Sequence, residues 1–453
     1  MGNHALVRGF VEANTRVVTA YPGSPTPEIA DGIRAIPPDT RPFYFEFSTN
    51  EKVATEVAFG ASINGHLSSV FFKSVGLNVA ADTFVQLSHM RLKGGLVVII
   101  GDDPGANSSQ NEQDNRHIAQ LAYTPVLEPA TPQEVYEMYL QAVKLTTQLQ
   151  MPVILRLTTH VCHARGRVVF GEYTPDSSPR DPAFDPQGFE YLPITKLVYP
   201  MKRRAMENLQ AVKESADSMA VNRVVDHGNG RRGVITMGVP FLSLMDVIEG
   251  IPGKPDIFKL GMVYPLPEAS ILDFLRSHEE VKILEELDDI VERSIKSLAW
   301  DARLDVKIVG KTDLDDWMGE YTPAKVHAVI SKVWPDMLEA REERPVLPQT
   351  APPRPAQMCP GCGHRSAFFA IKKALEPTDI TVADIGCHTL GFLPPYNMGQ
   401  VLLCMGASPG IAAGLSLFND SRKVLAFMGD STFYHAGSAG VINAVFNQHN
   451  LTL

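Results

Sequence analysis

Short apolar segments alternate with helix-like segments through residues 1–165 of this chain. The apolar segments have the length of buried strands, and the intervening segments place apolar residues at helical spacing with few glycines or prolines. Strands that alternate with helices predict a parallel sheet covered by helices on both faces, and therefore an α/β fold. The expected strands are 16–20, 43–47, 69–73, 96–101 and 152–157, and the expected helices are 51–65, 79–92 and 132–148.

Two changes of composition divide the rest of the chain. The first is a segment rich in proline and charge that ends in a charged helical pattern at 201–220. The second is a short run dense in prolines, which is typical of a linker. The predicted organisation is a first α/β domain at 1–165, a linker or crossover at 166–225, a second α/β domain at 226–344, a proline-rich linker at 345–356 and a third α/β domain at 357–453.

Composition excludes several classes of protein. Apolar residues make up 44% and charged residues 20%, which is ordinary for a soluble globular protein. A net charge of −10 without a long basic run gives no electrostatic basis for binding nucleic acid. The sequence shows neither a basic-apolar leader nor an apolar run of roughly 18 residues, so we expect no secretion and no membrane span. Five cysteines, an odd number for a disulfide framework, favour a reducing, cytoplasmic setting.

The segment Gly429-Asp430-Ser431 follows an expected apolar strand at 423–428 and precedes a helix-like segment at 436–448. A Gly-Asp turn at the carboxyl end of a strand places a carboxylate beside a helix N-terminus, where backbone N–H groups attract phosphate. One carboxylate together with phosphate oxygens is a common ligand set for Mg²⁺. The segment resembles the opening of the thiamine diphosphate motif, whose closing Asn would fall past Leu453.

Glu51 begins a helix-like segment rich in small residues, directly after the expected strand at 43–47. The helix dipole alone favours an acid at this position, which is the structural alternative. The functional interpretation pairs Glu51 with Asp430, because thiamine diphosphate requires a carboxylic acid at its aminopyrimidine ring. Such an acid needs a pKa raised by an apolar pocket. The sequence therefore predicts that one domain supplies Glu51 and another the metal–diphosphate site.

Two more loops follow expected strands, at the sheet edge where open α/β folds bind ligands. The stiff, proline-rich loop at 21–28 offers Ser24 as a polar contact, although a simple connection explains the loop as well. The polar loop at 101–117 contains Arg116, whose guanidinium would offer a bidentate fork to a substrate carboxylate. A solvated connecting loop is the alternative there.

The CxxC segment at 359–364 has three interpretations. A turn that contacts a cofactor, with glycines that permit close backbone approach, is favoured. A zinc or iron–sulfur site would also need Cys387 and Cys404, whose spacing is irregular. A thioredoxin-like redox pair lacks a thioredoxin-sized unit around it. The candidate cofactor contacts in this part of the chain are Cys359, Gly361, Cys362, Gly363, His364, Cys387, His388 and Gly406.

In their order along the chain, these segments resemble the 2-oxoacid:ferredoxin oxidoreductases, and among them the large subunits of the indolepyruvate type. The matching segments are 21–25, 50–54, 73–78, 102–105, 108–116, 359–364 and 429–433. The resemblance implies a three-domain thiamine diphosphate enzyme. Its parts would be a pyrimidine-binding domain at 1–165, a transketolase C-terminal-like domain at 226–344 and an incomplete diphosphate-binding domain at 357–453.

The activity that the resemblance implies is oxidative decarboxylation of an aryl- or branched 2-oxoacid, similar to indolepyruvate, to an acyl-CoA with electron transfer to ferredoxin. The resemblance makes Glu51 the activating glutamate, Asp430 a magnesium ligand and Ser24 a substrate contact. Arg116 stays the substrate contact expected from the polar loop itself. With the contacts expected from the residues themselves, the full set of predicted cofactor contacts is Ser24, Cys359, Gly361, Cys362, Gly363, His364, Cys387, His388, Gly406, Gly429, Asp430 and Ser431.

The resemblance also implies partners: a smaller catalytic (beta) subunit, ferredoxin or a similar acceptor, coenzyme A and the 2-oxoacid, in a cytoplasmic hetero-oligomer built on a dimer. Related subunits continue into a ferredoxin-like domain with [4Fe-4S] clusters, which we expect in the complete enzyme but not ligated by this chain. We therefore expect a truncated or partial chain, or a natural split gene. The alternatives are a thiamine-dependent decarboxylase that releases an aldehyde without oxidation, and a non-catalytic assembly subunit.

Overall fold

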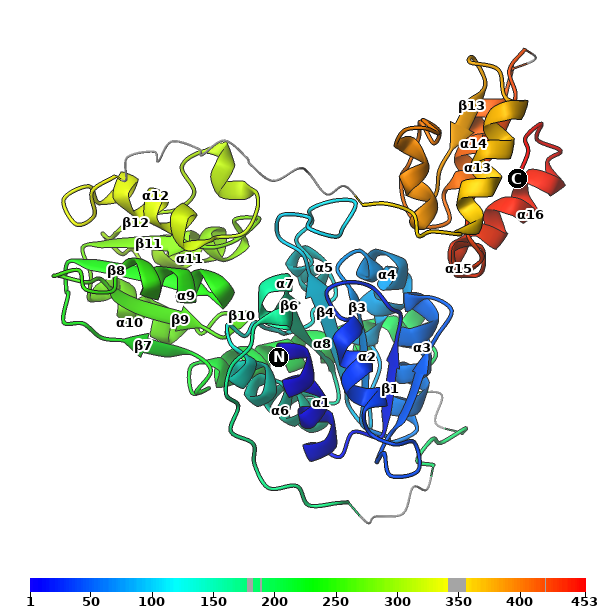
Figure 1. Ribbon diagram of the computed structural model, residues 1–453. Coiled ribbons are helices and arrows are strands. Elements are labelled where there is room, and N and C mark those ends of the chain that lie inside the picture. Colours follow the sequence, from blue (N-terminus) through cyan, green and yellow to red (C-terminus); the bar gives the residue numbers. More distant parts are fainter. Residues whose placement is uncertain (177–181, 188–189, 341–355, 420) are drawn as a thin grey trace. The chain divides into compact units, whose positions relative to one another are not determined.

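The computed structural model describes residues 1–176, 182–187, 190–340, 356–419 and 421–453. These residues form two compact units, Met1–Glu342 and Glu343–Leu453, and each is described by itself. Figure 1 shows the elements of both units in the order of the chain. No helix among the described residues combines the length and the apolar character needed to cross a bilayer.

The first unit contains a seven-stranded sheet with the order β10-β5-β6-β4-β3-β1-β2. Neighbouring strands from β5 to β2 run parallel, and only β10 pairs antiparallel, with β5. The strands are β1 (Val17–Ala20), β2 (Tyr44–Phe47), β3 (Ser68–Lys73), β4 (Leu96–Asp102), β5 (Val126–Leu127), β6 (Pro152–Thr158) and β10 (Met262–Tyr264).

Helices cover both faces of this sheet, as the alternation predicts. Along β4, Val97 and Ile99 join a core with α1, α2 and α6, whereas Val98 and Ile100 join a second core with α3, α4 and α5. Successive residues of one strand therefore lie in different cores, which explains the continuous apolar sequence of β4. The helices are α1 (Gly2–Glu12), α2 (Pro27–Arg34), α3 (Glu51–Ile63), α4 (Gly76–Leu87), α5 (Arg116–Leu121) and α6 (Pro132–Leu149).

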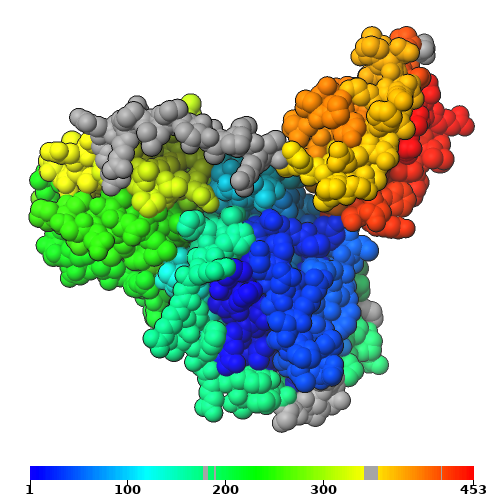
Figure 2. Space-filling view, viewed as in Figure 1, coloured from blue at the N-terminus to red at the C-terminus, as the bar shows by residue number. Residues whose placement is uncertain are grey.

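Two helix starts in this part of the chain are fixed by side-chain caps. The Asn50 side chain accepts a hydrogen bond from the Val53 backbone N–H at 2.8 Å and begins α3, and the Thr131 hydroxyl does the same for Glu134 at the start of α6. After β6 and the short α7 (Thr159–His163), the chain runs over α1, where Arg8 donates to the Gly171 carbonyl. Figure 2 shows this segment on the surface beside the N-terminal elements.

A five-stranded sheet with the order β12-β11-β8-β9-β7 follows in the same unit. Its strands are β7 (Arg223–Val225), β8 (Arg232–Met237), β9 (Asp256–Leu260), β11 (Glu280–Leu284) and β12 (Lys307–Val309). Its helices are α9 (Gly238–Val247), α10 (Glu268–Arg276), α11 (Ile290–Asp301) and α12 (Pro323–Val333), and α8 (Val198–Ala216) precedes it. Ile235 and Phe258 of this sheet share one core cluster with Val70 and Val98 of the first sheet, so the two sheets pack together.

The second unit is smaller and is built on two parallel strands, β13 (Ile380–Val382) and β14 (Val424–Ala426). Its core of fully buried apolar residues includes Val382, Ala412 and Ala426. The helices are α13 (Gly363–Ala374), α14 (Ser408–Ser416), α15 (Asp430–Thr432) and α16 (Ser438–Phe446), with a π-helical turn at Phe433–Gly437.

The predicted fold class, α/β with mostly parallel sheets, is confirmed. The strand expected at 423–428 is shorter, and the helix expected at 436–448 is one part of a run that begins at Asp430. The sequence did not predict the position of β10. This strand belongs to the predicted second domain by sequence, but it pairs with β5 in the first sheet. The predicted domain limits stay a prediction, and nearly all of the proline-rich linker at 345–356 lies outside the described residues.

Candidate functional site

Glu51 is the first residue of α3 and follows the carboxyl end of β2. It is 4% exposed. Its carboxyl group lies against the first residue of α4, Gly76, because a Cβ added to that glycine would come within 2.7 Å of the Glu51 Oε1 atom. A glycine is therefore required beside this carboxyl group, which leaves the Glu51 carboxylate in a close-fitting cradle.

Glu51 lies near the point of the sheet where the order of strands reverses. From β1 the chain crosses to β2 on one side, and from β3 it crosses to β4 on the other. In open α/β sheets the loops diverge at such a point and leave a crevice at the carboxyl ends of the strands. Ser24 lies in the loop after β1 and is exposed. The Ser108 hydroxyl donates to the Ser24 carbonyl at 3.4 Å, so the loop after β4 reaches the same edge.

The loop after β4 is held against the end of β3 by several bonds. The Lys73 ammonium donates to the Ser108 carbonyl at 2.8 Å, and the amides of Asn78 and Gln113 exchange two hydrogen bonds. Burial lowers the pKa of Lys73, although the charges of Asp103 and Glu51 act in the opposite direction. Burial and the Glu51 charge raise the pKa of Tyr21, at the end of β1. Lys73 was not among the predicted site residues, yet its ammonium contacts the loop after β4 at this edge of the sheet.

The sequence led us to expect that Arg116 presents its guanidinium to a ligand. In the structure this guanidinium is instead bonded to other residues of the chain. Its side chain is 1% exposed and makes ion pairs with Asp114 and Glu285 at 2.5 and 2.7 Å. Nη2 also donates to the Glu286 carbonyl at 3.0 Å. Asp114 and Glu285 raise the pKa of Arg116 although burial opposes it. In this structure Arg116 ties the loop after β4 to the turn between β11 and α11.

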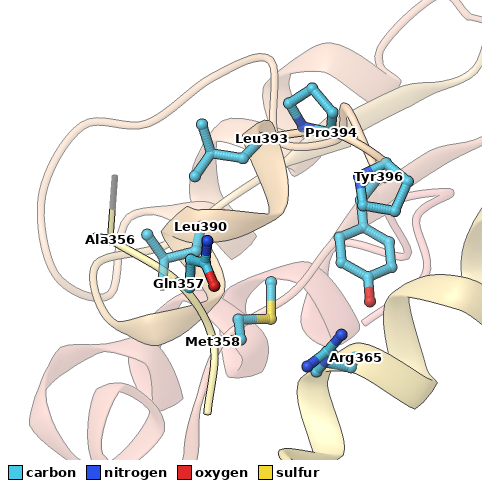
Figure 3. Close-up of a pocket in the computed structure, with 9 residues that line it drawn as sticks. Ala356, Gln357, Met358, Arg365, Leu390, Leu393, Pro394 and Tyr396 are labelled. Carbon is cyan, nitrogen blue, oxygen red and sulfur yellow. The ribbon is translucent and has the colours of Figure 1, made fainter. Parts of the chain in front are cut away.

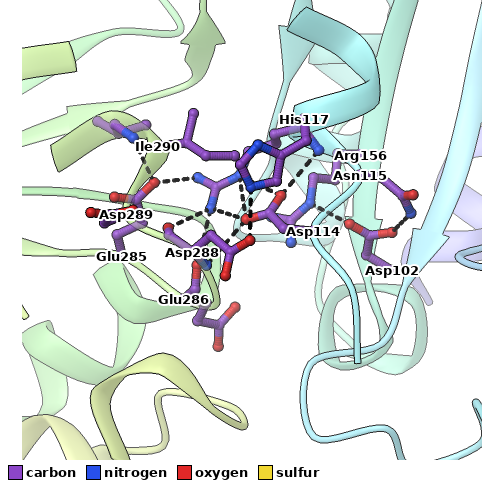
Figure 4. A network of polar contacts seen from close by, with 12 residues as sticks. Asp102, Asp114, Asn115, His117, Arg156, Glu285, Glu286, Asp288, Asp289 and Ile290 are labelled. Carbon is purple, nitrogen blue, oxygen red and sulfur yellow. Dashed lines mark hydrogen bonds and ion pairs between the residues drawn. The ribbon is translucent and has the colours of Figure 1, made fainter. Parts of the chain in front are cut away.

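The ion pairs of Arg116 belong to a buried polar network between the two sheets of the first unit (Figure 4). On the first sheet, Arg156 bonds Asp102 at 2.6 Å and Glu128 at 2.7 Å. On the second sheet, Glu286 is 3% exposed. One of its oxygens accepts the Tyr321 backbone N–H at 2.8 Å, and the other has no hydrogen-bond partner among the described residues. Burial raises the pKa of Glu286 from 4.5 to about 7.

We expect Glu286→Gln to make the protein more stable than the wild type at about pH 8 and to change stability little at about pH 5. The folded-state pKa of Glu286 lies above the unfolded value, so the folded state binds the extra proton and stability falls as pH rises toward 7. A glutamine is neutral at both pH values and removes that loss, by about 1–3 kcal/mol at the higher pH. Urea unfolding at both pH values measures the difference, with the exposed Glu279→Gln as control. An equal difference between wild type and Glu286→Gln at both pH values would contradict the prediction.

In the second unit, Gly429, Asp430 and Ser431 lie where β14 ends and α15 begins. Asp430 and Ser431 are exposed. The neighbouring Thr432 hydroxyl donates to the Ile385 carbonyl at 3.1 Å, which ties this turn to the segment after β13. The structure therefore places an accessible carboxylate at the carboxyl end of a parallel strand, beside the backbone N–H groups of a helix start.

His388 lies next to this turn. A Cβ added to Gly429 would come within 3.3 Å of the His388 ring. His388 is 4% exposed, and its Nε2 atom has no hydrogen-bond partner among the described residues. Burial lowers the pKa of His388. Its ring lies 5.5 Å from that of His364, whose Nδ1 atom is 3.2 Å from the Cys362 sulfur. The structure thus brings Cys362, His364, His388 and Gly429 to one edge of the second unit.

The other predicted contacts are distributed around this edge. Cys359 and Cys387 are exposed, and all described cysteines are free. Gly406 has a φ of 88°, and its N–H donates to Asp384 at 2.7 Å. Within the described residues, no three His, Cys, Asp or Glu side chains gather as a metal-binding group. A metal cluster held by Cys359, Cys362, Cys387 and Cys404 therefore has no support in this geometry.

A pocket of about 270 Å³ flanks the CxxC segment. It is lined by Met358, Arg365, Leu393 and Tyr396, among others, and Figure 3 shows the Arg365 side chain pointing toward Tyr396. None of the predicted cofactor contacts, Gly429 and Asp430 included, is among the residues that line this pocket.

Two domain models define the class of protein. The model described as "Pyruvate flavodoxin/ferredoxin oxidoreductase, thiamine diP-bdg" matches residues 8–226, which include Glu51. The model described as "Thiamine pyrophosphate enzyme, C-terminal TPP binding domain" matches residues 384–453, which include Asp430. The chain is therefore a protein of the thiamine-diphosphate-binding class, with both kinds of cofactor domain.

Whole-length relatives define the family more closely. The chain is 39% identical to the indolepyruvate oxidoreductase subunit IorA of Methanothermobacter thermautotrophicus over 100% of its own length and 74% of that protein. The corresponding subunit of Thermococcus kodakarensis is 37% identical, with 73% of its length covered. The chain belongs to the family of indolepyruvate oxidoreductase IorA subunits. A 2-oxoglutarate:ferredoxin oxidoreductase from Magnetococcus marinus shares the fold, with a TM-score of 0.56 at 16% identity, over 74% of this chain and 64% of that one.

Proposed function

We propose that this chain is the thiamine-diphosphate-dependent subunit of an oxidoreductase that acts on an aryl- or branched 2-oxoacid similar to indolepyruvate. The 2-oxoacid and coenzyme A would give an acyl-CoA and CO₂, and the two electrons released would pass to ferredoxin. The observation that carries the proposal is Glu51, a buried carboxyl group in a glycine-lined cradle at the carboxyl edge of a parallel sheet. The identity to IorA subunits supports the substrate class.

The residues of both units fit thiamine diphosphate. In the first unit, Gly76 leaves room for the Glu51 carboxyl group at the carboxyl edge of the sheet, where a group that exchanges a proton with an aminopyrimidine ring would be needed. In the second unit, the unpartnered Nε2 atom of His388 lies beside a turn that offers helix N–H groups to a diphosphate. When bound, thiamine diphosphate supplies the electron sink for loss of CO₂.

The chain's own residues would bind, orient and move protons. Glu51 would take up and return a proton at its carboxyl group, and its burial would exclude water from that exchange. Asp430 would hold Mg²⁺ together with diphosphate oxygens, since Mg²⁺ in proteins often has one or two carboxylates and phosphate ligands. Ser24, Cys359, Cys362, His364 and Gly406 remain proposed contacts.

The proposal includes partners and a location. The relatives are named as subunits of indolepyruvate oxidoreductases, which supports a smaller catalytic subunit beside this chain. Ferredoxin, coenzyme A, [4Fe-4S] clusters outside this chain, a hetero-oligomer built on a dimer and a cytoplasmic location complete the proposal.

A product assay of the complete enzyme tests the proposed function. We expect an arylpyruvate, coenzyme A and a one-electron dye to yield CO₂, acyl-CoA and reduced dye, in dependence on added thiamine diphosphate and Mg²⁺. Release of an aldehyde without dye reduction would instead identify a non-oxidative decarboxylase. Failure to bind thiamine diphosphate in calorimetry would identify an assembly subunit.

A further inference from the structure

A 2-oxoacid carries a carboxylate, and a cationic side chain near Glu51 would offset its charge. Arg116, the predicted partner, is taken by Asp114 and Glu285. Arg156 is buried in ion pairs with Asp102 and Glu128. Both guanidiniums are thus paired with carboxylates of the protein itself. The Nη2 atom of Arg156 has no hydrogen-bond partner among the described residues, but it is buried and does not face an anion at the surface.

Lys73 has different surroundings. It is the last residue of β3, and its side chain is half-buried. Three positions later in the sequence comes Gly76, the glycine that lies against the Glu51 carboxyl group. The Nζ atom donates to a neutral acceptor, the Ser108 carbonyl, at 2.8 Å. Among the residues that the structure describes, no carboxylate lies within ion-pair distance of Lys73, so its charge is not cancelled by a bonded partner.

Two carboxyl groups lie near enough to Lys73 to act on its charge, and they would repel an anionic substrate if Lys73 were absent. Asp103 and Glu51 both act on the ammonium electrostatically. Asp103 is itself satisfied, since it accepts the Ser108 N–H and the Thr159 hydroxyl at 2.8 Å each. Without Lys73, an anionic substrate would therefore meet these carboxyl groups without the opposite charge that Lys73 supplies.

The position of the Lys73 ammonium is set by a glycine in the loop after β1. A Cβ added to Gly23 would come within 2.7 Å of the Lys73 Cδ atom. Gly23 lies next to Ser24, the predicted substrate contact. The φ angle of Gly23 is not positive, so an alanine fits the backbone at this position. Its added methyl group would displace the Lys73 side chain.

We propose that the Lys73 ammonium binds the carboxylate of the 2-oxoacid substrate. Lys73 supplies the positive charge that the sequence assigned to Arg116, and Gly23 keeps the lysine stem in position. The proposal rests on the proposed function, because it assigns a substrate group to that same site.

Lys73→Met in the complete enzyme tests the proposal. We expect KM for an arylpyruvate to rise by about 10- to 100-fold, with little change in kcat, because a charge-assisted hydrogen bond is lost. Inhibition by the corresponding neutral 2-oxoamide should stay the same, and so should the calorimetric affinity for thiamine diphosphate. Lys73→Arg should retain most of the affinity for the 2-oxoacid, and Gly23→Ala should raise KM in the same direction as Lys73→Met.

Lys93→Met is the matched control, because the Lys93 ammonium also donates to a backbone carbonyl, that of Ala183, at 3.1 Å. An unchanged KM in Lys73→Met would overturn the proposal, and so would a parallel loss of thiamine diphosphate affinity, which would place Lys73 at the cofactor. If Lys73→Met fails to fold, equal KM values for wild type and Gly23→Ala overturn it. If the wild-type enzyme binds no 2-oxoacid, the proposed function itself is contradicted, and the assignment of Lys73 falls with it.

Discussion

Glu51→Gln is expected to lower turnover of the 2-oxoacid by about 100- to 10,000-fold, the range that a lost general acid–base group produces. Glutamine keeps the shape of the side chain and its place against Gly76, but its amide cannot take up and return a proton. We therefore expect the calorimetric affinity for thiamine diphosphate to change little. Hydrogen–deuterium exchange at C2 of the bound cofactor should slow in parallel with turnover, which separates loss of proton transfer from loss of binding.

Glu56→Gln is the matched control for this prediction. Glu56 lies on the same helix, its side chain is 42% exposed, and it pairs with Lys52 on the surface. An exposed pair of this kind contributes little, so Glu56→Gln should retain wild-type turnover. If Glu51→Gln also kept wild-type turnover, Glu51 would be a structural helix-start residue and the proposed function would lose its main support.

Much of the fold could be predicted from local patterns. The strand expected at 96–101 is β4, because its run of β-branched residues is buried on both faces of a parallel sheet. The helix start at Glu51 follows from Asn50, whose capping bond spans only three residues. The strands β5 and β10 gave no such signal. They have two and three residues, and β10 pairs with a partner far away in sequence, so no periodicity could reveal them.

The site was predictable only where its chemistry is local. Glu51 could be proposed because its position after a strand and before a small-residue helix is visible in the sequence. Arg116 was expected in an open loop, whereas the structure buries it in ion pairs, and its partner Glu285 lies 169 residues away. Lys73 was missed for a similar reason: Ser108, which holds its ammonium, comes from a different loop. Side chains whose roles depend on distant partners cannot be assigned from spacing alone.

Arg116→Met is expected to destabilise the first unit by about 3–5 kcal/mol, because it leaves the buried carboxylates of Asp114 and Glu285 without their opposite charge. The three tryptophans of the chain, Trp300, Trp317 and Trp334, all lie in that unit. Their fluorescence during urea unfolding of the whole chain therefore reports on the part that carries Arg116. A double variant that also has Glu285→Gln should recover part of the loss, since one unpaired buried charge is removed.

Arg293→Met is the comparison variant for Arg116. Arg293 lies on α11, and its guanidinium pairs with Asp289 one turn away with a side chain that is 61% exposed. Its loss should cost less than about 1 kcal/mol, as for other surface pairs. If Arg116→Met were as stable as Arg293→Met and raised KM for the 2-oxoacid, the prediction would be contradicted. Arg116 would then bind the substrate, and there would be no reason to assign the substrate carboxylate to Lys73. Loss of stability without a selective change in KM places Arg116 in the packing of the two sheets, because its buried guanidinium already donates its N–H groups to Asp114 and Glu285.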